Sequence, residues 1–154
     1  MSTVIYCDGS YIPKIGMGCG VYIENSPLSY NAILFKPDEV RHTAPRAELL
    51  ALSYALHAAS QVTIPVAIFS DNKYTVDTFN TFYTNWAQTN FSKKEYKHLD
   101  IIHPMYAYFA SQHGRITISH VFAHTGVVGN EYADRLAKQA GTLPPSTTSY
   151  ITLQ

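Results

Sequence analysis

Two aspartates stand where the sequence predicts the ends of strands. Asp8 follows the β-branched and aromatic run Thr3 to Cys7, and Asp71 follows the short apolar run Val66 to Ser70. In an α/β sheet, ligands bind beside the carboxyl ends of the strands. The two carboxylates are therefore expected to converge on one site.

Two further acids lie within predicted helices, Glu48 four residues before Leu52 and Asp134 among apolar residues of the last helix. An acid on the side of a helix that faces the sheet needs a counter-charge, which a metal ion can supply. Carboxylate oxygens without cysteine suit Mg²⁺ or Mn²⁺, and paired ions of this kind hydrolyse phosphodiesters. The alternative is that each acid is solvated or paired with a neighbour such as Arg46 or Arg135.

The scaffold that must position these acids is predicted to be α/β. The expected elements are three strands within residues 3–35, a helix over Pro45–Ala59, a strand over Val66–Ser70, helices to about Thr81 and over Leu99–Gln112, a strand over Arg115–Phe122, and a helix from a cap at Asn130 to Ala140. Because strands alternate with helices in the later part, those strands should be parallel and central, with helices on the sheet faces. Residues 142–154, with Pro144-Pro145, are expected to form a flexible C-terminal tail after a single domain over residues 1–141.

The composition narrows the classes of function. A chain of 154 residues with 46% hydrophobic content suits one compact domain. Equal numbers of basic and acidic residues, 11 each, argue against a broad cationic face, so a polyanion would be bound by a local patch or through metal. Cys7 and Cys19 support neither zinc nor a disulfide framework. With no secretory signal and no run of 18 apolar residues, we expect an intracellular protein without a membrane partner.

Four segments carry a resemblance to a known family. CDGS (Cys7 to Ser10), PRAELLAL (Pro45 to Leu52), FSDNKY (Phe69 to Tyr74) and AHTGVVGNEYADRLAKQAG (Ala123 to Gly141) resemble ribonucleases H of type 1, in the order of that family. The resemblance implies a ribonuclease H-like fold with a single catalytic domain and no hybrid-binding domain. It also implies a five-stranded mixed sheet with the second strand antiparallel and helices on both faces.

The same resemblance implies roles for individual residues. The acids that would hold two Mg²⁺ ions, with Mn²⁺ as a substitute, are Asp8, Glu48, Asp71 and Asp134. His124 would assist proton transfer or product departure from a mobile loop, and Glu131 would be a secondary acid. The implied activity is endonucleolytic hydrolysis of the RNA strand of RNA–DNA hybrids, leaving 3′-hydroxyl and 5′-phosphate ends. The other six histidines are interpreted as surface or structural residues.

The residues expected to contact the DNA strand depart from the family pattern. Phe82, Trp86 and Phe91 resemble aromatic residues that begin a basic protrusion in many family members, although core packing explains the same spacing. Only three cations, Lys93, Lys94 and Lys97, follow closely, so these contacts should be weak.

A second departure precedes Glu48, where Ala44 and Pro45 stand in place of the amide side chains that often reach the minor groove. Recognition of the hybrid would then rest on Thr43, Asn72 and groups around Gly9 and Ser10.

Two other functions remain open at this stage. One is a DNA nuclease of the same superfamily, resembling a resolvase, and the other is a non-catalytic nucleic-acid-binding domain. A non-catalytic domain would be expected to lose carboxylates, whereas all four are present. We expect a monomer; the alternative is a part of a larger replication or reverse-transcription polyprotein, with a viral or mobile-element origin.

Overall fold

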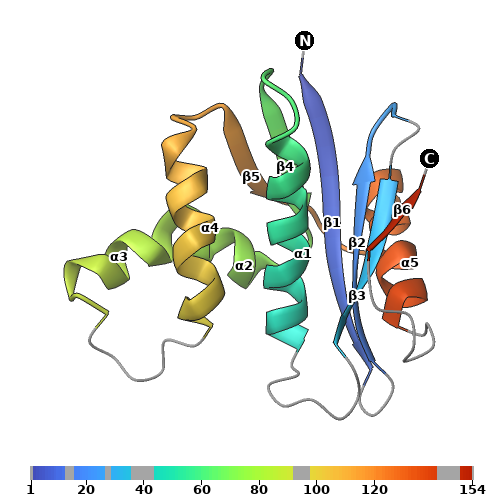
Figure 1. The fold of residues 1–154 in the computed structure, drawn as a ribbon, viewed down its shortest axis with the longest axis horizontal. Helices are drawn as coiled ribbons and strands as arrows, with labels where there is room; N and C mark the ends of the chain where they lie inside the picture. Colours follow the sequence, from blue (N-terminus) through green and yellow to red (C-terminus); the bar gives the residue numbers. More distant parts are fainter. Residues whose placement is uncertain are drawn as a thin grey trace.

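A six-stranded mixed sheet forms the centre of the computed structural model, which describes residues 2–12, 16–26, 29–35, 44–91, 98–141 and 150–153. Its strands are β1 (Thr3–Ile12), β2 (Gly16–Ile23), β3 (Ser29–Phe35), β4 (Val66–Ser70), β5 (Ile116–His120) and β6 (Tyr150–Leu153), in the spatial order β5-β4-β1-β2-β3-β6 (Figure 1). β2 pairs antiparallel with β1 and β3, whereas β4 pairs parallel with β1 and β5. The predicted mixed sheet with an antiparallel second strand is confirmed.

The predicted number of five strands is wrong. Residues 150–153, which the sequence placed in a flexible tail, form β6 and pair antiparallel with β3. Tyr150, Ile151 and Thr152 are residue types that favour strands, and their pairing with β3 outweighs the polar character of the segment around them. Residues 142–149 lie outside the described part of the chain.

Helices cover both faces of the sheet, as predicted. They are α1 (Ala44–Ala59), α2 (Lys73–Asp77), the π-helical turn η1 (Thr78–Phe82), α3 (Tyr83–Gln88), α4 (Leu99–Ser111) and α5 (Val128–Gly141). α1 and α4 lie on one side of the sheet and α5 lies on the other (Figure 1). No helix among the described residues has both the length and the apolar character needed to cross a membrane.

The main core lies between the sheet and the helices α1 and α4. Leu49, Leu52 and Leu56 of α1, which recur at helical spacing, are all buried, and they pack with strand residues such as Ile5 and Ile68. Burying such aliphatic side chains contributes roughly 1.5–3 kcal/mol each. This packing holds the start of α1, and with it Glu48, against the central strands.

Two of the boundaries that differ from the sequence-based expectation affect the site. β1 does not end at Asp8 but continues to Ile12, because residues 8–12 stay paired with β2. α5 begins at Val128, so Asn130 lies inside its first turn and does not cap it. Asp8 is thus delivered from within a strand, and the side chain of Asn130 is available for a tertiary contact.

Candidate active site

Three of the four predicted acids meet at one end of the parallel strands. The parallel pairing of β1 with β4 ends at Cys7 and Ser70, so Asp8 and Asp71 follow side by side. Glu48 reaches the same place from the first half of α1. One carboxylate oxygen from each of Asp8, Glu48 and Asp71 lies within 4.8 Å of the other two. The structure therefore brings these three predicted ligands together.

Glu48 can approach β1 because residue 9 is glycine. A Cβ atom at Gly9 would lie 2.3 Å from the carbonyl carbon of Ala47, which is closer than such contacts occur. The main chain of β1 therefore lies directly against α1, and the N–H of Gly9 donates a hydrogen bond to Oε1 of Glu48. The predicted role of Gly9 in binding substrate remains a prediction, since in this structure its N–H serves an acid of the site.

Asp134 joins the site from the opposite face of the sheet. It shares a hydrogen bond with Asp8, and its Oδ2 also pairs with Nζ of Lys138 at 3.0 Å. Gly20 of β2 permits this, because a Cβ atom there would lie 2.2 Å from the carbonyl oxygen of Ala133. α5 is thus close enough to the sheet for Asp134 to reach Asp8, although Asp134 is not part of the group of three.

Burial and mutual repulsion dominate the electrostatics of the acids. Asp8 is 5% exposed and Glu48 is 8% exposed. Burial, followed by the neighbouring charge of Glu48, raises the pKa of Asp8 well above its usual range. Burial likewise raises the pKa of Glu48 to about 7, although hydrogen bonds from Asp8 and from the N–H of Gly9 work to lower it. At neutral pH, bound protons therefore relieve the repulsion among these carboxylates unless a cation does so.

The pKa of Asp134 shifts in the opposite direction. Burial alone would raise the pKa of Asp134, but hydrogen bonds from Asp8 and Lys138, together with the charges of Lys138 and His124, lower it. The protonated carboxyl of Asp8 is accordingly the donor in its hydrogen bond with Asp134. Asp134 stays ionised at neutral pH and adds negative charge at the edge of the site.

The carboxylate oxygens of this site are suitable ligands for divalent cations. Buried carboxylates that crowd together and resist ionisation are stabilised by a cation, and oxygen ligands alone suit Mg²⁺ and Mn²⁺. Asp8, Glu48 and Asp71 would provide the first ligands, and Asp134 lies next to Asp8 to complete the set.

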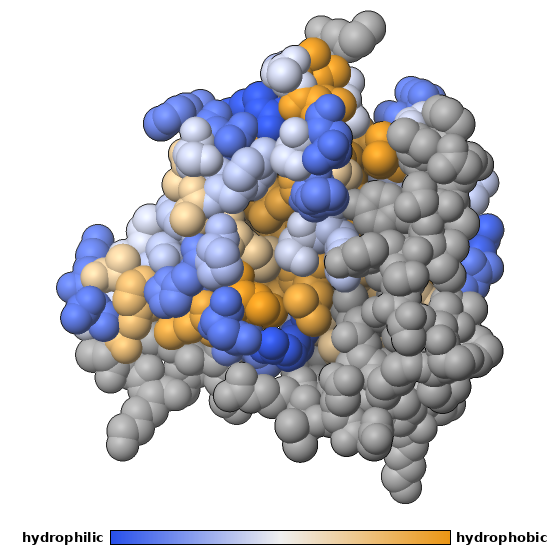
Figure 2. All heavy atoms as spheres, viewed as in Figure 1, coloured by the Kyte–Doolittle hydropathy of each residue, from blue (hydrophilic) through white to orange (hydrophobic). Residues whose placement is uncertain are grey.

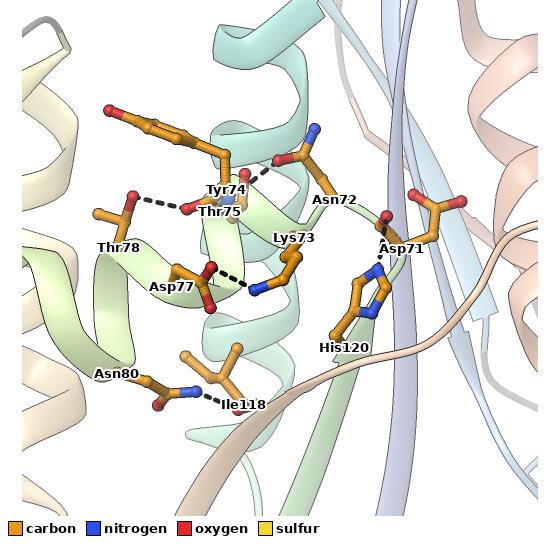
Figure 3. Close-up of polar contacts among 10 residues, drawn as sticks. All are labelled: Asp71, Asn72, Lys73, Tyr74, Thr75, Asp77, Thr78, Asn80, Ile118 and His120. Atoms are coloured by element: carbon orange, nitrogen blue, oxygen red, sulfur yellow. Dashed lines mark hydrogen bonds and ion pairs between the residues drawn. The ribbon is translucent and has the colours of Figure 1, made fainter.

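Asp71 is held by two residues that the sequence analysis did not assign to the site, since it interpreted Asn130 as a helix cap and His120 as a surface or structural residue. The side-chain amide of Asn130 donates to Oδ2 of Asp71 at 3.3 Å. Nε2 of His120, at the end of β5, lies 3.2 Å from the main-chain oxygen of Asp71. Figure 3 marks this contact with a dashed line. Asn130 shares its helix face with the buried Ala133 and Ala137, so helical spacing counted from Asp134 is the signal that could have found it.

His124 lies in the exposed connection between β5 and α5. Its main chain has a φ of 57°, in the left-handed region, and its charge acts on Asp134. The structure thus places His124 near enough to Asp134 for its charge to act there, and its predicted role at the scissile phosphate remains a prediction. Glu131 lies exposed in the first turn of α5, and its secondary role is likewise untested.

The predicted substrate contacts are only partly described. Asn72 caps α2, accepting a hydrogen bond from the N–H of Thr75 at 2.9 Å, and Ser10 is half-buried in β1. Trp86 is half-buried against the main core and stacks with Phe82 at 6.2 Å. Figure 2 shows hydrophobic residues reaching the surface amid hydrophilic ones around α3 and α4. The other predicted contacts, Thr43, Lys93, Lys94 and Lys97, lie outside the described residues.

Comparisons with known proteins place these features in a family. The family model described as RNase H matches residues 1–142. Ribonuclease H of Francisella philomiragia is 31% identical over 144 residues, covering 90% of this chain and 90% of that protein. Ribonuclease H of Schizosaccharomyces pombe is 28% identical over 90% of this chain, but the chain spans only 53% of that longer protein.

The fold is also shared with solved structures. The RNase H domain of prototype foamy virus superposes with a TM-score of 0.72 at 24% identity, covering 91% of this chain and 93% of that domain. At this identity the likeness concerns the fold alone. Together, the family model over almost the whole sequence and the relative in Francisella philomiragia show that the chain belongs to the ribonuclease H family of nucleases.

Proposed function

We propose that the chain hydrolyses the RNA strand of RNA–DNA hybrids, using two Mg²⁺ ions for which Mn²⁺ can substitute, and leaves 3′-hydroxyl and 5′-phosphate ends. The observation that carries this proposal is the group of Asp8, Glu48 and Asp71, whose oxygens lie within 4.8 Å of one another at the carboxyl ends of parallel strands. Membership of the ribonuclease H family supplies the substrate class. A foamy viral protease-reverse transcriptase, of which 20% matches the fold of this chain, has been solved in complex with an RNA/DNA hybrid, which agrees with that class.

The chain's own residues would divide the work between binding the ions and handling protons. Asp8, Glu48, Asp71 and Asp134 would bind the ions, which when present stabilise the attacking and leaving oxygens of the phosphodiester. The N–H of Gly9 holds Oε1 of Glu48 and so helps to orient this carboxylate toward the other acids. His124, exposed and close enough for its charge to act on Asp134, would transfer a proton at the scissile phosphate or help the product depart.

Substrate binding would involve both strands of the hybrid. Thr43, Asn72, Gly9 and Ser10 would contact the hybrid near its minor groove, and Trp86 with Lys93 and Lys94 would contact the DNA strand. Since Asn72 Oδ1 already caps α2, its contribution would come from the amide nitrogen. We further propose that the chain acts as a monomer. A place within a longer protein is the alternative, because some relatives and structural neighbours are much longer than this chain.

The proposal is tested by incubating the protein with matched RNA–DNA, RNA–RNA and DNA–DNA duplexes in Mg²⁺. Only the RNA strand of the hybrid should be cut, and end-labelling should show 3′-hydroxyl and 5′-phosphate ends. Cutting of the DNA duplex would instead favour a DNA nuclease. No cutting of any duplex, with hybrid binding retained, would favour a non-catalytic binding domain.

The matched variants are Asp71→Asn and Asp77→Asn. Asp71→Asn should lower turnover by several orders of magnitude with little change in metal-free binding of the hybrid, because it weakens a metal ligand. Asp77, which pairs with Lys73 at 2.7 Å on the neighbouring helix, lies outside the group of acids, so Asp77→Asn should retain turnover. Retention of more than about a tenth of turnover by Asp71→Asn would remove this residue from the metal site.

A further inference from the structure

Asn130 is a buried polar side chain that directly contacts one of the three acids. It is only 2% exposed, and its amide nitrogen lies 3.3 Å from Oδ2 of Asp71. A carboxylate only accepts hydrogen bonds, so the nitrogen and not the oxygen of the amide must face Asp71. The contact engages Oδ2 of Asp71, whose carboxylate also shares a side-chain hydrogen bond with Glu48.

The position of Asn130 is set by two close approaches of α5 to the sheet. A Cβ atom at Gly129 would overlap the ring of Tyr6, at 2.1 Å from its nearest atom, and Gly20 similarly admits the main chain at Ala133. Asn130 and Asp134 are separated by one helical turn and therefore lie on the same face of α5. The same rigid helix thus presents one acid to Asp8 and one amide to Asp71.

The main chain of Asp71 is held independently of its carboxylate. His120 reaches the main-chain oxygen of Asp71, so its Nε2 carries the proton in this contact. Figure 3 shows the imidazole directed at that main-chain oxygen, while the carboxylate of Asp71 points away from His120. With the main chain fixed from β5, the remaining freedom of Asp71 is rotation of its side chain, which Asn130 restricts from α5 and a side-chain hydrogen bond with Glu48 restricts from α1.

We propose that Asn130 is a positioning residue that orients the carboxylate of Asp71 toward the cation and couples its placement to that of Asp134 through α5. This inference rests on the proposed function, because it assigns the cation to the same acids. An amide is suited to this role, since it donates a hydrogen bond without bringing a positive charge that would compete with the cation. A lysine or arginine in its place would neutralise the site that the cation must enter.

The contact itself can be tested without metal. In the metal-free protein, the side-chain amide signals of Asn130 in a ¹⁵N–¹H spectrum should shift when Asp71 is changed to alanine. The side-chain amide of Asn80, which donates to the main-chain oxygen of Ile118 at 2.8 Å, provides the internal control and should shift much less. Asn130 signals that do not respond to Asp71→Ala would overturn the inference, and this measurement needs no Asn130 variant to fold.

The effect on the cation is tested by Mg²⁺ calorimetry. Asn130→Ala should weaken Mg²⁺ binding by about tenfold, as expected when a partner of a metal ligand is lost. In the background of Asp71→Ala the same substitution should have little further effect, because the group that it orients is gone. Asn80→Ala, the matched loss of an amide elsewhere, should leave Mg²⁺ affinity unchanged.

Turnover separates positioning from a loss of stability. Asn130→Ala should lose turnover at low Mg²⁺ and regain most of it when Mg²⁺ is raised, with KM for the hybrid little changed. Equal Mg²⁺ affinities of the wild type and Asn130→Ala, or additive effects in the two backgrounds, would contradict the inference even if hybrids are cut. If Mg²⁺ affinity depends on Asn130 but no hybrid is cut, the proposed function fails and the inference stands.

Discussion

The crowding of buried carboxylates predicts that Asp8→Asn stabilises the metal-free protein. Asp8 and Glu48 are almost fully buried, and together with Asp71 they place oxygens within 4.8 Å of one another. Two unit charges 4.8 Å apart repel by about 3.5 kcal/mol at an effective dielectric constant of about 20. The fold avoids part of this cost by keeping a proton, as the raised pKa of Asp8 shows.

The free energy needed to keep Asp8 protonated sets an upper limit on the stability that Asp8→Asn can add. The unfolded pKa of an aspartate is about 4, so holding one protonated at neutral pH costs about 4 kcal/mol. Asparagine has the shape of aspartic acid and keeps a donor for Glu48 and Asp134, so most of the packing should survive. Allowing for imperfect hydrogen bonds, we expect Asp8→Asn to raise the free energy of unfolding by about 2 kcal/mol, or the Tm by roughly 4–8 °C.

The raised pKa values also predict how the stability of the metal-free protein changes with pH. A carboxyl whose folded pKa is raised contributes stability below its unfolded pKa of about 4, and this contribution is lost as the pH rises through the folded value, about 7 for Glu48. The metal-free wild type should therefore lose stability through Glu48 as the pH rises from about 4 to about 7, and Asp8, whose pKa is raised further, should extend this loss above pH 7. The advantage of Asp8→Asn over the wild type should widen across the same range.

Thermal unfolding followed by circular dichroism in EDTA measures this directly, with Asp77→Asn as the control. That substitution breaks only the exposed pair with Lys73, so it should lower stability by less than about 1 kcal/mol without a widening difference. Mg²⁺ at about a hundred times its Kd should then stabilise the wild type by about 2.7 kcal/mol and the Asp8→Asn variant much less. A metal-free Asp8→Asn variant less stable than the wild type at neutral pH, or an advantage that does not change with pH, would refute the reasoning.

Two further outcomes follow from the site. Gly20→Ala should lower the free energy of unfolding by at least about 2 kcal/mol in chemical denaturation, because its Cβ atom would lie 2.2 Å from the carbonyl oxygen of Ala133; an unchanged midpoint would mean that α5 does not pack this closely. His124→Ala should reduce turnover roughly ten- to a hundredfold without changing Mg²⁺ affinity. His113→Ala serves as its control, since that histidine is also exposed with a positive φ; loss of Mg²⁺ binding in His124→Ala would make His124 a ligand.

The elements governed by local patterns were predictable from the sequence. The spacing of leucines in α1 and the apolar run of β4 predicted both elements to within one residue, because their side chains enter the core that the pattern implies. The three acids that converge were found through their positions relative to these elements, with the family resemblance supporting the assignment. Periodicity and strand ends are local properties of a chain, and these residues obey them.

Contacts between distant segments explain where prediction failed. Gly9 and Ser10 resemble a turn after Asp8, but β2 continues to pair with this segment, and the missing side chain of Gly9 serves the approach of α1. Asn130 is a common helix cap, yet its environment is decided by Asp71, which lies 59 residues earlier in the sequence. β6 depends on a partner strand more than a hundred residues away, and no local pattern reports such a pairing.

The order of the strands affects whether two copies of this protein can pair through the borders of their sheets. Both border strands of the sheet are short, β5 with 5 residues and β6 with 4, while the longer β1, β2 and β3 lie inside together with β4, which also has 5 residues. An unpaired border strand offers free N–H and C=O groups that can recruit a strand from another molecule, and short borders limit this. β6 occupies four positions of β3, Ser29 to Ala32, that would otherwise form such a template. By covering this part of β3 and leaving only four residues at the border, β6 should limit intermolecular strand pairing and aggregation.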